Sequence, residues 1–157
     1  MTMLLKLGAI NGECKRDGYD KWIEVDSLQF GVGRGISSAS GATSRQASEP
    51  SVSEVVFTKS MTIDSGDLFF QSLCGTGVKA EFHVINTNSK TNKPYFTVTL
   101  EDTMISGYSV SSGGDRPSES ISLNFTKIAF KYDQYDGDTV VASGTEKKWS
   151  LTTSKEY

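Results

Sequence analysis

Several residues of this sequence have types that could do chemistry, but their spacing does not assemble a catalytic set. Residues 31–35 read GVGRG, which looks like part of a phosphate-binding loop. Such a loop needs a Lys-Ser or Lys-Thr pair that opens a helix, and neither follows here, so we interpret the segment as a flexible loop. Many serines are present with one histidine, His83, and without the G-x-S-x-G pattern of a hydrolase elbow.

The acidic residues are no better placed for catalysis or metal binding. Asp133, Asp136 and Asp138 lack the order and the closing glutamate of a calcium loop, which favours a solvated turn. Glu101 and Asp102 are adjacent in a predicted strand, so their side chains point to opposite faces and cannot act as a pair. The sequence therefore predicts no catalytic residue, no metal site and no cofactor.

Composition excludes several other classes of protein. The chain has 157 residues and a formal net charge of −3, without a basic stripe, which argues against a nucleic-acid partner. No apolar run reaches the roughly 20 residues that span a bilayer, and the apolar start is too short for a signal peptide. His83 with two distant cysteines, Cys14 and Cys74, forms neither a metal site nor a disulfide framework, so we interpret all three as ordinary structural residues.

The elements that would position any site are mostly strands. Apolar and polar residues alternate with a period of two in four segments, at residues 5–9, 78–84, 96–100 and 121–125, and residues 55–59 also predict a strand. Residues 78–84 and 96–100 predict one hairpin, and Asp136-Gly137-Asp138 predicts a second hairpin turn. The apolar phase slips near Asp26-Ser27, within residues 22–32, and again between Phe125 and Ile128, which predicts a bulge or bend in each of two long strands.

One helix is predicted at about residues 65–74. Asp64 is a candidate N-cap, and Gly75 is a candidate left-handed stop. Phe69 and Leu73 lie four residues apart and are expected to face the body of the protein together. The predicted fold class is mainly β, a curled antiparallel barrel or sandwich with this helix on its flank.

A long segment at about residues 33–51 lacks periodicity and large apolar side chains. It exceeds the roughly 12–15 residues usual for an unstructured connection, which is typical of a functional or flexible loop. Residues 1–157 are otherwise expected to form a single domain.

Three blocks of sequence resemble one family. They are Leu4-Leu5-Lys6-Leu7 with Gly8, Gly12 and Glu13; Phe57-Thr58-Lys59 with Asp64-Ser65 and Leu68; and residues 115–119 with 122–128 and Tyr132. The matches extend over nearly the whole chain. In these blocks the sequence is similar to Hcp, the hemolysin-coregulated protein of type VI secretion.

The resemblance implies a structural tube subunit and not an enzyme. Six copies would close a ring, and rings would stack into a hollow tube with a spike protein at its tip, a contractile sheath around it and small effectors in its lumen. The protein would lie in the bacterial cytoplasm before firing and then be secreted, without membrane insertion. Two alternatives stay open, a phage tail-tube protein and a secreted monomeric β-sandwich that binds a ligand, for which Tyr95, Tyr108 and Tyr135 would share one face.

Two sets of residues are candidates for assembly. The long loop is expected to contact the next ring through Arg34, Ile36, Ser40, Thr43, Arg45 and Glu49. The predicted hairpin is expected to line the lumen or to contact a neighbouring subunit through Lys79, Glu81, His83, Thr97 and Thr99.

Overall fold

The computed structural model describes residues 1–36, 47–87, 90–136 and 139–157. It confirms a mainly β fold with one short helix. The elements in chain order are β1 (Thr2–Leu7), β2 (Ile23–Val25), β3 (Ser27–Gln29), β4 (Val32–Gly33), β5 (Ser51–Val52), β6 (Val55–Ser60), α1 (Ser65–Cys74), β7 (Val78–Ile85), β8 (Pro94–Ser111), β9 (Ser118–Asn124), β10 (Lys127–Asp136), β11 (Thr139–Ser143) and β12 (Lys147–Ser150).

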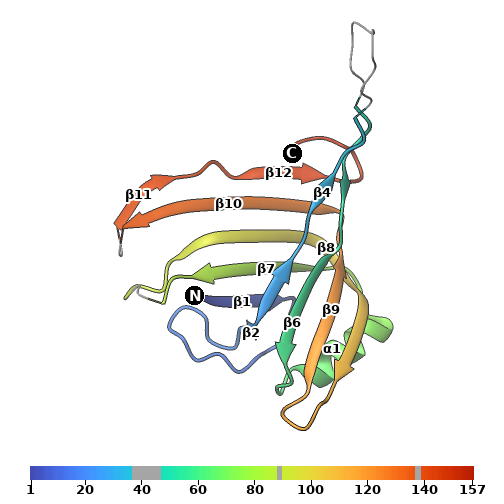
Figure 1. Ribbon diagram of the computed structural model, residues 1–157, viewed down its shortest axis with the longest axis vertical. Helices are drawn as coiled ribbons and strands as arrows, with labels where there is room; N and C mark the ends of the chain where they lie inside the picture. Colours follow the sequence, from blue (N-terminus) through green and yellow to red (C-terminus); the bar gives the residue numbers. More distant parts are fainter. Residues whose placement is uncertain (37–46, 88–89, 137–138) are drawn as a thin grey trace, which may run out of the picture.

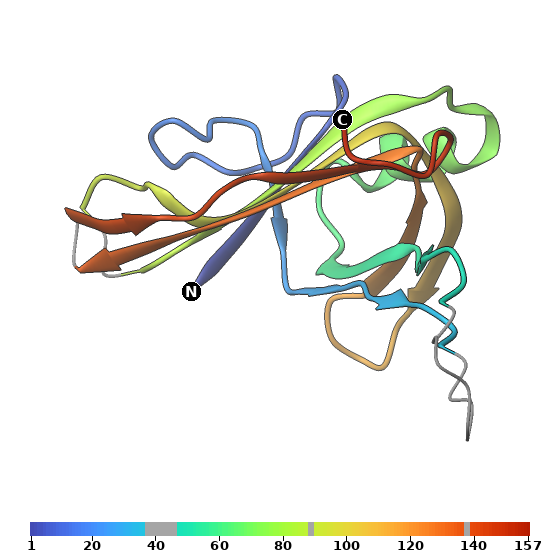
Figure 2. The ribbon, with the colours of Figure 1, turned by 90° about the horizontal axis from the view of Figure 1, so that it is seen from above.

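Ten of the strands form one antiparallel sheet that curls around the core, and β4 and β5 form a separate two-stranded sheet. The order of the large sheet is β2-β1-β7-β8-β9-β6-β3, and β10 adds to β8 and carries β11 and β12. Figure 1 shows an extended part, with β1, β7, β10 and β11, and a curled part, with β6, β9 and α1. Seen from above, the extended part crosses the molecule as a layer, and the curl closes back on one side of it (Figure 2).

The long strand β8 joins these two parts. Its first half pairs with β7 and β10, and its second half pairs with β9. At the bend Asp102 adopts a positive φ of 52°, and a Cβ on Gly77 would collide with the Asp102 carboxylate. The predicted hairpin of residues 78–84 and 96–100 is confirmed, because Phe82 pairs with Val98.

Both predicted phase slips mark places where the chain changes partner, and the prediction of continuous strands there was wrong. Residues 22–32 are split into β2, which pairs with β1, and β3, which pairs with β6. Residues 121–132 are likewise split into β9 and β10, which pair with different halves of β8. A period-two pattern that changes phase therefore indicates that the chain passes from one part of the sheet to the other, because the two parts bury different faces.

The predicted helix is confirmed, but three details differ. Asp64 is the N-cap residue, yet its side chain makes no capping hydrogen bond. Gly75 has φ −71° and is not left-handed; a Cβ there would collide with the Gln71 side chain. Leu68 is the helix side chain that is fully buried, whereas Phe69 and Leu73 point outward and are 52% and 66% exposed.

The core fills the curl and continues along one face of the extended sheet. Its fully buried side chains include Leu5, Phe57, Phe82, Leu100 and Ile121. Phe57 and Phe82 meet edge to face, with ring centroids 5.6 Å apart. No helix among the described residues is long and apolar enough to cross a membrane.

Candidate functional site

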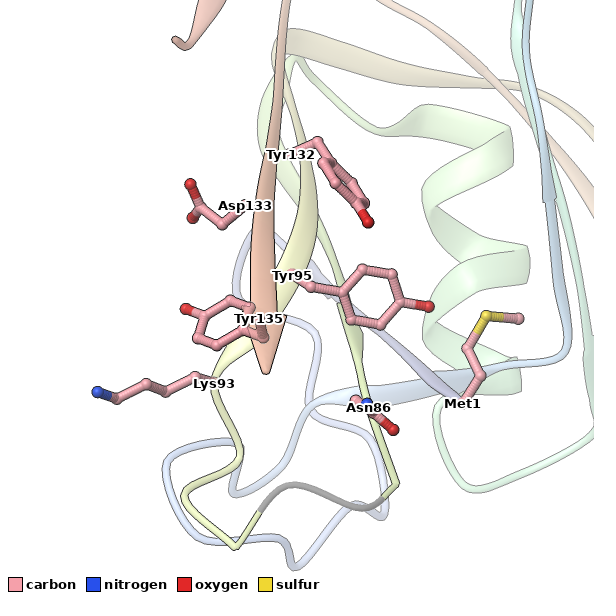
Figure 3. Close-up of a pocket in the computed structure, with 7 residues that line it drawn as sticks. All are labelled: Met1, Asn86, Lys93, Tyr95, Tyr132, Asp133 and Tyr135. Atoms are coloured by element: carbon pink, nitrogen blue, oxygen red, sulfur yellow. The ribbon is translucent and has the colours of Figure 1, made fainter. Parts of the chain in front are cut away.

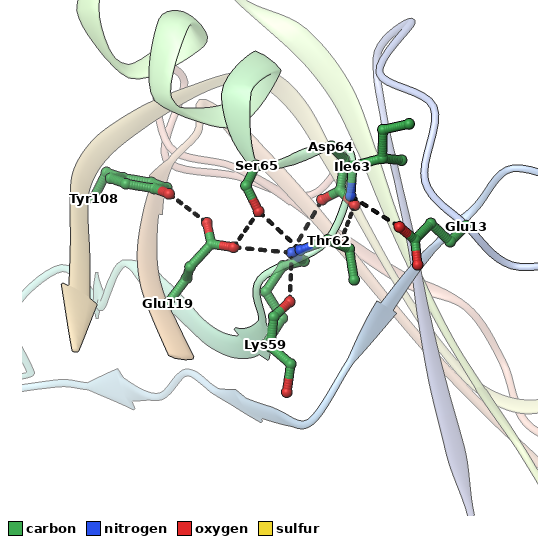
Figure 4. Close-up of polar contacts among 9 residues, drawn as sticks. Glu13, Lys59, Thr62, Ile63, Asp64, Ser65, Tyr108 and Glu119 are labelled. Carbon is green, nitrogen blue, oxygen red and sulfur yellow. Dashed lines mark hydrogen bonds and ion pairs between the residues drawn. The ribbon is translucent and has the colours of Figure 1, made fainter. Parts of the chain in front are cut away.

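A buried ionic cluster ties the start of α1 to the curled sheet (Figure 4). The Nζ atom of Lys59 lies 3.1 Å from Asp64 Oδ2 and 3.1 Å from Glu119 Oε1. All three side chains are almost fully buried. Ser65 donates a hydrogen bond to Glu119, and Tyr108 donates another of 2.5 Å to the second oxygen of Glu119. Burial, followed by the hydrogen bond to Glu119, raises the pKa of Tyr108 well above its usual range.

The cluster is closed to solvent, so it holds the helix in place and offers no surface to a substrate. The cluster was not predicted, although the sequence carries a signal for it. Lys59 is in phase with buried Val55 and Phe57, and Glu119 is in phase with buried Ile121. A charged residue at an inward position of an alternating strand indicates a buried partner of opposite charge, because an isolated buried charge is costly.

The residues predicted to line a lumen share one face of the extended sheet. Glu81 pairs with Thr99, and His83 pairs with Thr97. Lys79 forms an ion pair of 2.6 Å with Glu81, and the pKa of Lys79 is raised by its hydrogen bond to Glu81 and by the charge of that residue. We call this surface the polar face. Its assignment to a lumen stays a prediction.

His83 is the exception on the polar face, because the segment between β1 and β2 partly covers it. Its Nδ1 lies 3.0 Å from the Tyr19 hydroxyl, and its ring meets that of Trp22 edge to face at 4.9 Å. Burial lowers the pKa of His83.

Nearby, Cys14 is buried with Leu4 and Tyr19, whereas Cys74 on α1 is exposed. No group of three metal-binding side chains occurs in the part of the chain that the structure describes.

The opposite face of the extended sheet carries an exposed aromatic groove. Two hollows, of about 560 and 440 Å³, share the side chains of Phe30 and Phe130. Phe130 is 44% exposed and Val32 is 65% exposed, although Phe30 packs against the core. We define the aromatic groove by Phe30, Val32, Ile128, Phe130, Tyr132 and Trp149. The hydrophobic core thus extends to the surface without being covered by the described chain.

A smaller pocket of about 290 Å³ lies where β8 and β10 diverge (Figure 3). Of the three tyrosines expected to share one face in a ligand-binding module, Tyr95 and Tyr135 line this pocket, whereas Tyr108 lies elsewhere and donates a hydrogen bond to Glu119. Figure 3 shows Tyr95 and Tyr132 on one side of β10, and Asp133 and Tyr135 on the other. Ser143 donates a hydrogen bond of 2.7 Å to Asp133 and is the main cause of the lowered pKa of that carboxyl group. The three tyrosines of that alternative therefore do not form one binding face.

The predicted stacking loop is only partly described. β4 and β5 pair with each other, and Ile36 bridges Ala47, so the two ends of the loop form a narrow ribbon. The ribbon projects from the body in Figure 1. Arg34, Ile36 and Glu49 are exposed on or beside it. Ser40, Thr43 and Arg45 lie outside the described residues.

Comparisons with known proteins agree with this architecture. A structure described as that of a type six secretion system protein matches with a TM-score of 0.91 and 23% identity, covering 99% of both chains. Hcp1 from Salmonella typhimurium matches with a TM-score of 0.80 and 20% identity, covering 99% of this chain and 98% of its own. A type VI secretion system effector from Yersinia pestis matches with a TM-score of 0.71 and 22% identity, covering 94% of this chain and 98% of its own. At these identities the likeness shows the fold.

The family is shown by a sequence model. No curated protein matches the chain significantly. The model of the family described as "Type VI secretion system effector, Hcp" matches residues 4–132, which is most of the sequence. The chain therefore belongs to the Hcp family of the type VI secretion system.

Proposed function

We propose that this protein is the structural subunit of a type VI secretion tube, and that six copies close a ring. The observation that carries the proposal is the aromatic groove, where Phe30, which packs against the core, and the exposed Phe130 meet at the surface. A large exposed apolar patch is typical of a surface that a partner covers. In a ring that partner is another copy of the chain, and a stable contact would bury roughly 1,000–2,000 Å².

The two faces of the extended sheet have different roles in this proposal. The apolar face lies at subunit contacts, and the polar face, with Lys79, Glu81, Thr97 and Thr99, lines the channel. A polar wall of mixed charge lets small effector proteins pass without adhering through apolar contacts. A sheath would expel the tube, with a spike at its tip, from the bacterial cytoplasm into a target cell or the extracellular space.

Rings are proposed to stack through the projecting ribbon and loop, including Arg34, Ile36 and Glu49. Each contact is weak and reversible, but it is repeated around the ring, so the contacts strengthen one another through multivalency. Deleting residues 37–48 should leave rings intact and abolish tubes. Tubes of normal length from this deletion would contradict the proposed role of the loop.

Ring formation is tested with the purified protein. Light scattering after size exclusion should give a mass six times that of the 17.1 kDa chain, and negative-stain microscopy should show rings with a central hole. Phe130→Asp should shift the protein towards monomer without unfolding it, because this side chain is already 44% exposed. Lys131→Asp, one residue along β10, places the same side chain on the polar face and should leave the ring intact.

A further inference from the structure

The helix α1 presents a second exposed apolar surface. Leu68 faces the core, so at about 100° per residue the opposite side of the helix carries Gly66, Phe70 and Leu73, with Phe69 at its border. Phe70 and Leu73 are each 66% exposed. We call Gly66, Phe69, Phe70 and Leu73 the outer face of α1.

The outer face of α1 and the aromatic groove lie at opposite sides of the body. In Figure 1, α1 lies at the lower right beside β9, and β12, which contributes Trp149 to the groove, lies at the top. A closed ring needs two different surfaces on each subunit, one for each neighbour. This chain has one convex and one concave apolar surface, placed so that each can face a different neighbour.

Charge also favours a contact between these two surfaces. The only charged residue of α1 is Asp67, in its first turn, and its last turn has no basic side chain to balance the negative end of the helix dipole. Lys147 lines the groove beside Phe130, its cross-strand partner, and Lys148 lies next to it. Lys148 pairs with Glu146 at 3.7 Å and Glu156 also lines this hollow, so the charge that can meet the negative end of the helix is that of Lys147.

We infer that the outer face of α1 docks into the aromatic groove of the next copy of this chain. This inference rests on the proposed ring. Gly66 fits this role, because a Cβ there would meet nothing within 4 Å in the subunit, so a neighbour can approach the helix closely. The contact repeats around the ring, each subunit giving its helix to one neighbour and its groove to the other.

Cross-linking tests the contact directly, because the exposed Cys74 lies at the end of α1 and the other cysteine, Cys14, is buried. In the Lys147→Cys variant a short bismaleimide should join Cys74 of one subunit to the new thiol of the next, giving a ladder of bands up to the hexamer. Lys131→Cys, on the polar face, should give no ladder. Lys147→Cys combined with Cys74→Ser should also give none.

A second pair of variants tests the energetic role of the outer face. Gly66→Arg adds a long charged side chain without a clash inside the subunit, and should raise the concentration at which rings dissociate at least about tenfold. Gly66→Ala should leave that concentration nearly unchanged. At a protein concentration where rings are dissociated, thermal unfolding should show that neither variant is less stable than the unaltered chain, because both replace a helical glycine without a clash.

The outcomes separate this inference from the proposed function. Rings seen by microscopy without a Lys147→Cys ladder, or with an equal ladder from Lys131→Cys, would overturn the docking of α1 and leave the ring standing. Rings of Gly66→Arg as stable as those of Gly66→Ala would do the same. An unaltered chain that stays monomeric at every concentration would overturn both.

Discussion

Replacing Lys59 with Met should destabilise the folded subunit by about 3–5 kcal/mol, because a buried ion pair that loses one partner leaves an uncompensated charge. Lys59 is the cation between two buried carboxylates, at 3.1 Å from each. Among the described residues Asp64 Oδ2 has no hydrogen-bond donor, so its ion pair with Lys59 is its one polar contact. Lys59 Nζ also donates hydrogen bonds of 2.8 Å to the Ser60 carbonyl and 3.0 Å to Thr62 Oγ1.

This loss is large compared with the roughly 5–15 kcal/mol by which a domain of this kind is stable. Urea unfolding followed by circular dichroism measures it, at a protein concentration where rings are dissociated so that assembly does not contribute. Lys131→Met is the matched control, because Lys131 pairs with Asp133 at 3.5 Å in a partly exposed position and should cost no more than about 1 kcal/mol. Equal losses for the two variants would refute the reasoning.

Three further predictions concern the subunit. Burial lowers the pKa of His83, so as pH falls below about 6.5 the unfolded chain binds the proton before the folded chain does. The free energy of unfolding should therefore decrease more between about pH 7.5 and 5.5 for the unaltered chain than for His83→Gln, whose amide can still form a hydrogen bond with Tyr19. Equal decreases for the two proteins would contradict this. Leu68→Ala should cost about 2–5 kcal/mol by urea unfolding, since the side chain is fully buried, and a loss under about 1 kcal/mol would show that α1 packs loosely. Glu13→Ala removes the acceptor of a 3.0 Å hydrogen bond from the Ile63 amide. Hydrogen exchange at the Ile63 amide should therefore accelerate, while the free energy of unfolding falls by about 1 kcal/mol or less. Unchanged exchange would show that this hydrogen bond does not protect the turn.

Much of the fold could be predicted because period-two alternation directly reports a strand with one buried face. The strands around Phe82, Val98 and Ile121 were predicted for this reason. The length of β8 was not, because its buried face changes at the bend near Asp102, and a change of face erases the alternation. The orientation of α1 was missed because a ten-residue helix with several apolar side chains does not reveal which side packs inward.

The candidate surfaces were predicted unevenly for a related reason. The polar face follows from alternation, since Glu81 and His83 stand opposite Thr99 and Thr97 on one side of paired strands. The aromatic groove depends on contacts between residues far apart in the sequence, such as Phe30 and Phe130, with ring centroids 6.3 Å apart. No local pattern predicts that such residues meet and stay uncovered.

The central claim is that another copy of the same chain covers the aromatic groove. Light scattering across a dilution series of the unaltered protein and of Phe130→Asp tests it most directly. The account predicts a species of six chains for the unaltered protein, and a folded monomer for the variant at the same concentrations. A single chain at every concentration of the unaltered protein, or an equally stable hexamer of the variant, would contradict it.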